Sequence, residues 1–88
     1  MRRFTGSVRK LPEVKVIAVD ERRISVIADR AVAKTYVRAN AALDGLNAKL
    51  FFGDPFTMVV RDHVPEDELR QRLATPGILY VREDEESP

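Results

Sequence analysis

The fold is decided by two neighbouring stretches of sequence, Glu13-Val14-Lys15-Val16-Ile17-Ala18-Val19 and Arg23-Ile24-Ser25-Val26-Ile27-Ala28. Both are rich in β-branched residues and alternate between apolar and polar positions, which is typical of strands. The three residues between them, Asp20-Glu21-Arg22, suit a tight turn. The sequence therefore predicts an antiparallel hairpin over residues 13–28.

A long helix is expected directly after this hairpin. Residues 30–44 are rich in alanine and contain neither glycine nor proline. Asp29 stands where an N-cap belongs, and Gly45 suits the position after the last turn. Steps of three and four predict a buried stripe of Val32, Tyr36, Ala39, Leu43 and Leu46. A cationic stripe on another face consists of Arg30, Lys34 and Arg38.

Three further strands and a short helix are expected in the second half. Apolar runs at 48–52 and 56–61 flank the turn Gly53-Asp54-Pro55 and predict a second hairpin. A short helix follows over residues 64–73, where proline stands near the start, acids come first and bases last, as the helix dipole favours. The last strand is expected at 78–82.

The order of these elements predicts an α+β fold. From residue 23 onward it is strand, helix, strand, strand, helix, strand, which matches the ferredoxin-like split βαβ (β-α-β-β-α-β) arrangement with one or two extra N-terminal strands. Right-handed crossovers would place both helices on one face of the sheet. We expect a single domain over residues 1–82 and an acidic C-terminal tail over 83–88.

Composition argues against several kinds of chemistry. The 88 residues include no cysteine and one histidine, so disulfides, thiolate catalysis and the usual zinc ligand sets are not expected. His63 lies near Asp62 and Glu66 and could act as a base, but no serine or cysteine nucleophile accompanies it, and capping of the short helix is the favoured interpretation. We expect no enzyme, catalytic residue, metal, cofactor or small-molecule substrate.

No apolar stretch approaches the ~20 residues of a membrane span, and the basic N-terminal residues precede no apolar segment of a signal peptide. The expected location is the cytoplasm, or the inside of a particle assembled there, as in phage or mobile-element assemblies.

Alternation along the strands assigns each residue to one face of the sheet. The helix-side core is expected to contain Ile24, Val26, Leu50, Phe52, Met58, Val60, Leu79 and Val81. The apolar residues of the second face are Ile27, Phe51, Val59 and Tyr80. They form either a protein interface or ordinary core covered by the Phe4–Val8 segment and the first strand; the third interpretation is that Phe51 and Tyr80 stack nucleic-acid bases.

Charge is distributed unevenly although the net charge is only +1. Residues 1–50 hold 11 bases and 5 acids, a net +6, whereas residues 51–88 hold 4 bases and 9 acids, a net −5. The basic residues that could contact phosphates are Arg22, Arg23, Arg30, Lys34, Arg38, Lys49, Arg61 and Arg82, together with Arg2, Arg3, Arg9 and Lys10 near the N-terminus.

We therefore expect a small non-catalytic binding or assembly module that acts through protein contacts, either with copies of itself or within a larger assembly. The alternative is a nucleic-acid-binding protein that uses the basic helix stripe and the aromatic residues of the sheet.

Overall fold

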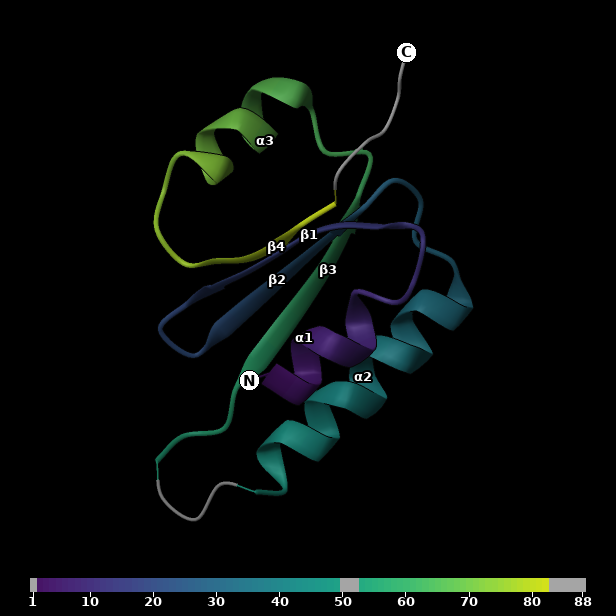
Figure 1. Ribbon diagram of the computed structural model, residues 1–88, viewed down its shortest axis with the longest axis vertical. Coiled ribbons are helices and arrows are strands. Elements are labelled where there is room, and N and C mark those ends of the chain that lie inside the picture. The colour runs from purple at the N-terminus through teal and green to yellow at the C-terminus, as the bar shows by residue number, and fades with distance from the viewer. Residues whose placement is uncertain (1, 50–52, 83–88) are drawn as a thin grey trace.

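Seven elements follow one another in the computed structural model, which describes residues 2–49 and 53–82 (Figure 1). They are α1 (Arg2–Val8), β1 (Val14–Asp20), β2 (Arg23–Ala28), α2 (Ala33–Asn47), β3 (Thr57–Asp62), α3 (Glu66–Leu73) and β4 (Ile78–Val81). The four strands form one mixed sheet in the order β3-β2-β1-β4. The predicted α+β class is confirmed.

The first hairpin forms as predicted and supplies the two central strands. β1 and β2 run antiparallel, with Asp20 opposite Arg23 at the turn and Val14 opposite Ala28 at the far end. Glu21 adopts a left-handed backbone conformation (φ 57°) that closes the turn. β4 pairs with β1 antiparallel, and β3 pairs with β2 parallel. It follows that β2, β3 and β4 all point in the same direction.

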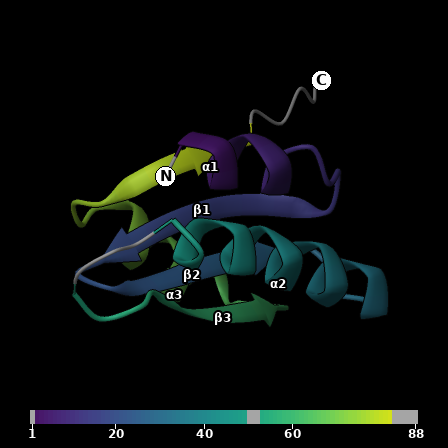
Figure 2. The same ribbon diagram turned by 90° about the horizontal axis from the view of Figure 1, so that it is seen from below.

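The helices cover both faces of the sheet. α1 and α2 lie side by side on one face, and α3 lies on the other (Figures 1 and 2). The prediction of both helices on one face is therefore wrong. The connection through α2 steps outward from β2 to β3, whereas the connection through α3 steps back across the sheet from β3 to β4. Right-handed crossovers in opposite directions place their helices on opposite faces.

The finer ferredoxin-like topology is not confirmed. Its second strand was expected at 48–52, but Ala48 and Lys49 lie in a turn after α2, and residues 50–52 lie outside the described residues. β1, expected as an addition, instead occupies the centre of the sheet.

The N-terminal segment forms helix α1 and covers the same face as α2. Its apolar residues Phe4 and Val8 are buried in the core cluster with Ile17, Ile24 and Val26. The expectation that residues 4–8 cover the second face is therefore wrong. Spaced four apart, Phe4 and Val8 share one side of a helix, which explains why this short segment can pack on the sheet.

Helix α2 begins and ends later than expected, and Thr35 provides a contact at its N-terminus. The backbone N–H of Val32 donates to Thr35 Oγ1 (3.1 Å), and this hydroxyl donates to Glu13 Oε2 (2.6 Å). Asp29, the expected cap, is instead engaged in ion pairs with other residues. The helix also continues through Gly45 to Asn47.

The buried stripe of α2 differs from the prediction at its N-terminal end. Thr35 and Ala39 are buried, and Leu43 and Leu46 pack against the core cluster. Val32 and Tyr36, which were expected in the stripe, are exposed. Thr35 takes their place, because it lies four residues before Ala39 on the same side of the helix.

Gly77 makes the turn between α3 and β4 and lies against β1. Its φ of 95° is in the region that favours glycine. Its carbonyl oxygen accepts a hydrogen bond from the N–H of Val19 (2.8 Å). A Cβ at this position would lie 2.1 Å from the carbonyl oxygen of Val19, so β4 can reach β1 only with glycine here.

We predict that Gly77→Ala lowers the free energy of unfolding by at least ~1–3 kcal/mol, because backbone strain and the clash with Val19 act together. Gly45→Ala is the matched control, since a Cβ there meets nothing within 4 Å and Gly45 lies inside α2. It should raise the free energy of unfolding by ~0.5–1 kcal/mol. Urea denaturation measures both variants, and equal effects would contradict this account.

Candidate functional site

The face of the sheet beneath α3 is covered unevenly. Val16 and Ala18 on β1 are buried, and Ile27 on β2 is 5% exposed. Val59 on β3 is 45% exposed. None of the residues of α3 is itself buried. The helix therefore shields β1 and β2 but leaves the β3 side of this face open to solvent.

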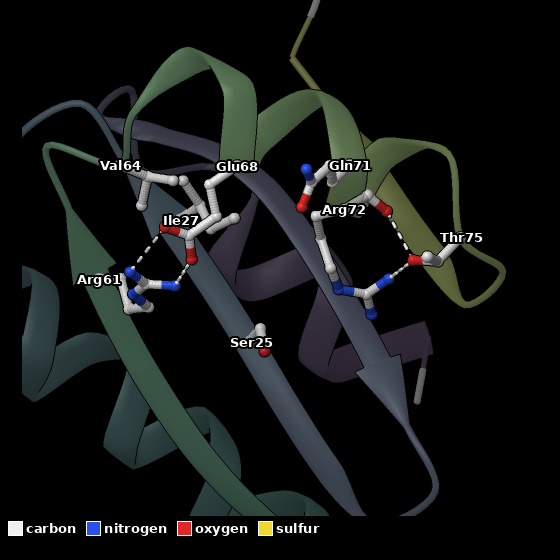
Figure 3. A pocket seen from close by; sticks show the side chains of 8 residues that line it. All are labelled: Ser25, Ile27, Arg61, Val64, Glu68, Gln71, Arg72 and Thr75. Atoms are coloured by element: carbon white, nitrogen blue, oxygen red, sulfur yellow. Dashed lines mark hydrogen bonds and ion pairs between the residues drawn. The ribbon is translucent and has the colours of Figure 1, made fainter.

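A cavity of about 270 Å³ lies between α3 and the sheet (Figure 3). Ser25 and Ile27 line it from β2, and Arg61 lines it from β3. The residues that line it from α3 and its flanking turns are Val64, Glu68, Gln71, Arg72 and Thr75. The cavity is open and mainly apolar, which makes it a candidate surface for docking.

Two arginines tie α3 to its surroundings at the mouth of this cavity. Both terminal nitrogens of Arg61 bind Glu68, with Nη2 3.3 Å from Oε1 (Figure 3). The hydrogen bond from Arg61 lowers the pKa of Glu68 below its ordinary value. Arg72 donates to Thr75 Oγ1 and to the carbonyl oxygen of Pro76 (3.3 Å). Polar contacts at its rim thus help to hold a helix that has no buried residue.

The polar residues at the carboxyl ends of β2 and β3 are engaged in structural contacts. Asp62 Oδ2 accepts a hydrogen bond from the N–H of Ala31 (3.0 Å). His63 is exposed in a left-handed conformation (φ 54°), with Nε2 3.9 Å from Asp62 Oδ2. Asp62 therefore holds the segment that leads into α2. Its distance to His63 is too long for a hydrogen bond.

Asp29 lies at the end of β2 and joins three segments of the chain. Arg82 Nη2 is 2.7 Å from its Oδ2, and Lys15 Nζ is 3.4 Å from its Oδ1. Arg82 also donates to the carbonyl oxygen of Pro12 (2.7 Å). Partial burial works against ionisation of Asp29, but the hydrogen bonds and charges of Arg82 and Lys15 outweigh it and lower the pKa of this carboxyl.

Of the apolar residues predicted for the second face, the structure brings two together. Ile27 and Val59 lie on the α3 side of neighbouring strands. Tyr80 is placed on the opposite face, where it pairs with the core residue Ile17 and Arg9 lies over its ring at 5.1 Å. Phe51 lies outside the described residues.

The cations predicted to bind nucleic acid separate into different environments. Arg61 and Arg82 are engaged in the ion pairs described above. Arg22 lies over the ring of Phe56 (5.0 Å) at the hairpin end, where Arg23 lies beside acidic residues. Arg30 precedes α2 and is exposed. The remaining predicted cations, Lys34, Arg38 and Lys49, lie on or just after α2 beside α1.

Residues 2–8 were not expected to form a helix beside α2, so a surface that combines residues of α1 and α2 was not predicted. We call this surface the helix seam. It contains one hollow lined by Arg2, Arg3 and Lys49 and a second lined by Lys10, Lys34 and Arg38. The four-residue spacing of Phe4 and Val8 was the signal that could have revealed it.

No family model, curated protein or solved structure matches this chain. Among residues 2–49 and 53–82, no group of three or more acidic or histidine side chains is arranged to hold a metal ion. Within the same described ranges, the helices are too short or too polar to cross a bilayer.

We predict that Asp29→Asn lowers the free energy of unfolding at pH 7 by less than ~1 kcal/mol, because the ion pairs are partly exposed. The lowered pKa means that the stabilisation is present above the ordinary value of 3.8 and is lost as pH falls through the lower value of the folded protein. The difference from the parent protein should therefore shrink below about pH 4.

Asp44→Asn is the matched control for this measurement, since Asp44 is an exposed carboxylate of α2 with the same charge. Urea denaturation between pH 3 and pH 7 compares the two variants. A loss for Asp29→Asn no larger than that for Asp44→Asn, or one independent of pH, would show that the ion pairs are not stabilising.

Proposed function

We propose that this chain is a non-catalytic binding and assembly module of the cytoplasm, and that it associates with a second copy of itself along β3. The proposal is based on the observation that β3 is uncovered both on one face and along its outer backbone edge. Its face toward α3 is uncovered at Val59, and in the described part of the chain no strand pairs with its outer edge (Figure 2).

The hydrogen bonds of β3 determine which backbone groups are available at this edge. The N–H of Thr57 donates to the carbonyl oxygen of Arg22 (2.8 Å), so Thr57 and every second residue after it direct their backbone groups toward β2. The groups of Met58, Val60 and Asp62 consequently point outward. They are an unpaired template for another strand.

The first four residues of β3, Thr57 to Val60, lack the features that usually prevent such pairing, and its charged residues, Arg61 and Asp62, lie at its end. β3 contains no proline and no lysine, and its register with β2 is continuous from Thr57 to Asp62. Natural edge strands are generally protected by proline, lysine, a bulge or a covering element. Their absence from β3 supports an edge that is covered by a partner.

Two copies of β3 are complementary when they run antiparallel about a twofold axis at Val59. Met58 of each copy would then exchange backbone hydrogen bonds with Val60 of the other, and the two Val59 side chains would meet on the axis. Thr57 would lie opposite Arg61 of the second copy. This pairing brings apolar residues together at the centre and requires no like-charged pair.

We predict that the protein is a dimer by size-exclusion chromatography with light scattering and that Val59→Asp makes it a monomer. The substitution places two carboxylates opposite each other on the axis, while the partly exposed position tolerates the charge in a single copy. A shift of the dissociation constant by at least tenfold is expected, since each 1.4 kcal/mol corresponds to a factor of about ten.

Val81→Asp is the matched control, because Val81 is 46% exposed and lies on β4 at the other edge of the sheet. It should leave the dimer intact. A parent protein that remains monomeric up to high micromolar concentration would overturn the proposal. A dimer that is lost in Val81→Asp and kept in Val59→Asp would move the interface to β4 and would also contradict it.

A further inference from the structure

The helix seam presents two groups of cations along the junction of α1 and α2. The first hollow combines residues from the start of α1 and the end of α2, and the second combines residues from the opposite ends of the same helices. The two helices therefore run antiparallel, as Figure 1 shows. Each hollow has three basic residues at its rim, namely Arg2, Arg3 and Lys49 at one end and Lys10, Lys34 and Arg38 at the other.

The positive charge of the seam is not neutralised by the described residues. All six cations are exposed, and none of them forms an ion pair with residues 2–49 or 53–82. This differs from Lys15, Arg61 and Arg82, which are paired with carboxylates. Asp44 is the one acidic residue within the two helices. A surface of this kind attracts an extended polyanion.

The positions of the cations on α2 give the spacing of the two groups. Arg38 and Lys49 are eleven residues apart, and Lys34 and Lys49 are fifteen apart, which corresponds to ~16–22 Å along a helix. Between them α2 lines the first hollow with Ala41, Ala42, Gly45 and Leu46. Leu46 packs against the core cluster and the other three residues are small, so no long side chain blocks close approach. A ligand of the seam must therefore carry negative charge at two places separated by this distance.

Duplex nucleic acid meets this requirement. Its two phosphate backbones lie on either side of a major groove that is ~12 Å wide, so the phosphates themselves are farther apart than the groove. One group of cations can contact each strand. A single strand fits less well, since its binding depends on aromatic platforms for the bases. On the seam Phe4 is only 2% exposed, and Tyr36 lies on a different side of α2.

We infer that the helix seam binds the phosphate backbone of duplex nucleic acid, with one cation group on each strand. The inference goes beyond the self-association proposed above and does not depend on it. No base-reading residue is assigned, because the contacts are all to phosphates. Binding is therefore expected to be independent of sequence and strongly dependent on salt.

The test measures the affinity for a fluorescently labelled 16-base-pair DNA duplex by anisotropy at several salt concentrations. Six phosphate contacts predict a slope of about −5 for the logarithm of the binding constant against the logarithm of the salt concentration. Two triple variants each remove one group: Arg2→Gln/Arg3→Gln/Lys49→Gln and Lys10→Gln/Lys34→Gln/Arg38→Gln. Each should weaken binding and make the slope shallower by about 2–3.

The control variant is Arg22→Gln/Arg23→Gln/Arg70→Gln, which removes the same charge from the hairpin and from α3. It should change the slope by less than about 1, because these residues lie outside the seam. All substituted seam residues are exposed, so the variants should retain the thermal unfolding of the parent protein, which circular dichroism checks. Binding by Val59→Asp should show the same dependence on the seam, which separates this inference from self-association.

Three results would overturn the inference. The first is no detectable binding of the duplex at 50 mM salt. The second is a control variant that weakens binding as much as the seam variants do, since attraction would then depend on total charge alone. The third is equal or tighter binding of a single strand or of an acidic peptide of the same charge, which would assign the seam to that ligand instead.

Discussion

Burial of the central hairpin on both of its faces is the constraint on which the structure depends. Val16, Ile17 and Ala18 are consecutive residues of β1, and each is no more than 1% exposed. Since neighbouring side chains point to opposite faces, neither face of this strand can be left to water. A covering layer is required on each side. α1 and α2 form one layer together, and α3 with its flanking turns forms the other.

The two layers differ in how many of their residues are buried. This difference explains why part of the sheet remains exposed on the α3 side. The layer of α1 and α2 contributes Phe4, Val8 and Ala39 to the buried interior. α3 has eight residues, which span ~12 Å, and none of them is buried. A helix of this length that returns from β3 to β4 crosses over β2 and β1. β3 is therefore the strand that it covers least.

The elements that depend on local signals were predictable from the sequence, and their assembly was not. The first hairpin, β3, α3 and β4 lie close to their expected positions because turn residues and apolar periodicity mark them. The uninterrupted run Val16-Ile17-Ala18-Val19 was interpreted as an alternating strand, whereas such a run also indicates burial on both faces. That second interpretation would have required helices on both sides of the sheet.

The candidate surfaces were predictable only where they follow from one element. Ile27 and Val59 were assigned to one shared face and do share it, because the registers of β2 and β3 follow simple alternation, although α3 covers part of that face. Tyr80 was assigned to the wrong face, and the register of β4 with β1 shifts between Ile17 and Ala18. A shift of one residue moves side chains to the other face, and alternation within β4 alone cannot reveal it. The helix seam depends on two segments of the chain: the spacing of Phe4 and Val8 indicates that the first segment is helical, but no local pattern places that helix beside α2.

The symmetry of the proposed dimer would increase the affinity of the helix seam for its inferred ligand. Antiparallel pairing of β3 with its copy requires a twofold axis perpendicular to the sheet, and such an axis keeps each face on the same side. The α1 and α2 layers of the two copies would then lie on one side of a continuous sheet. Two seams of six cations would face the same direction, and a duplex long enough to reach both would be held at two places. Linked sites of this kind increase the overall affinity without any new contact within either copy. In this geometry, dimerisation through β3 increases the affinity of the helix seam for duplex nucleic acid, although no residue of β3 belongs to the seam.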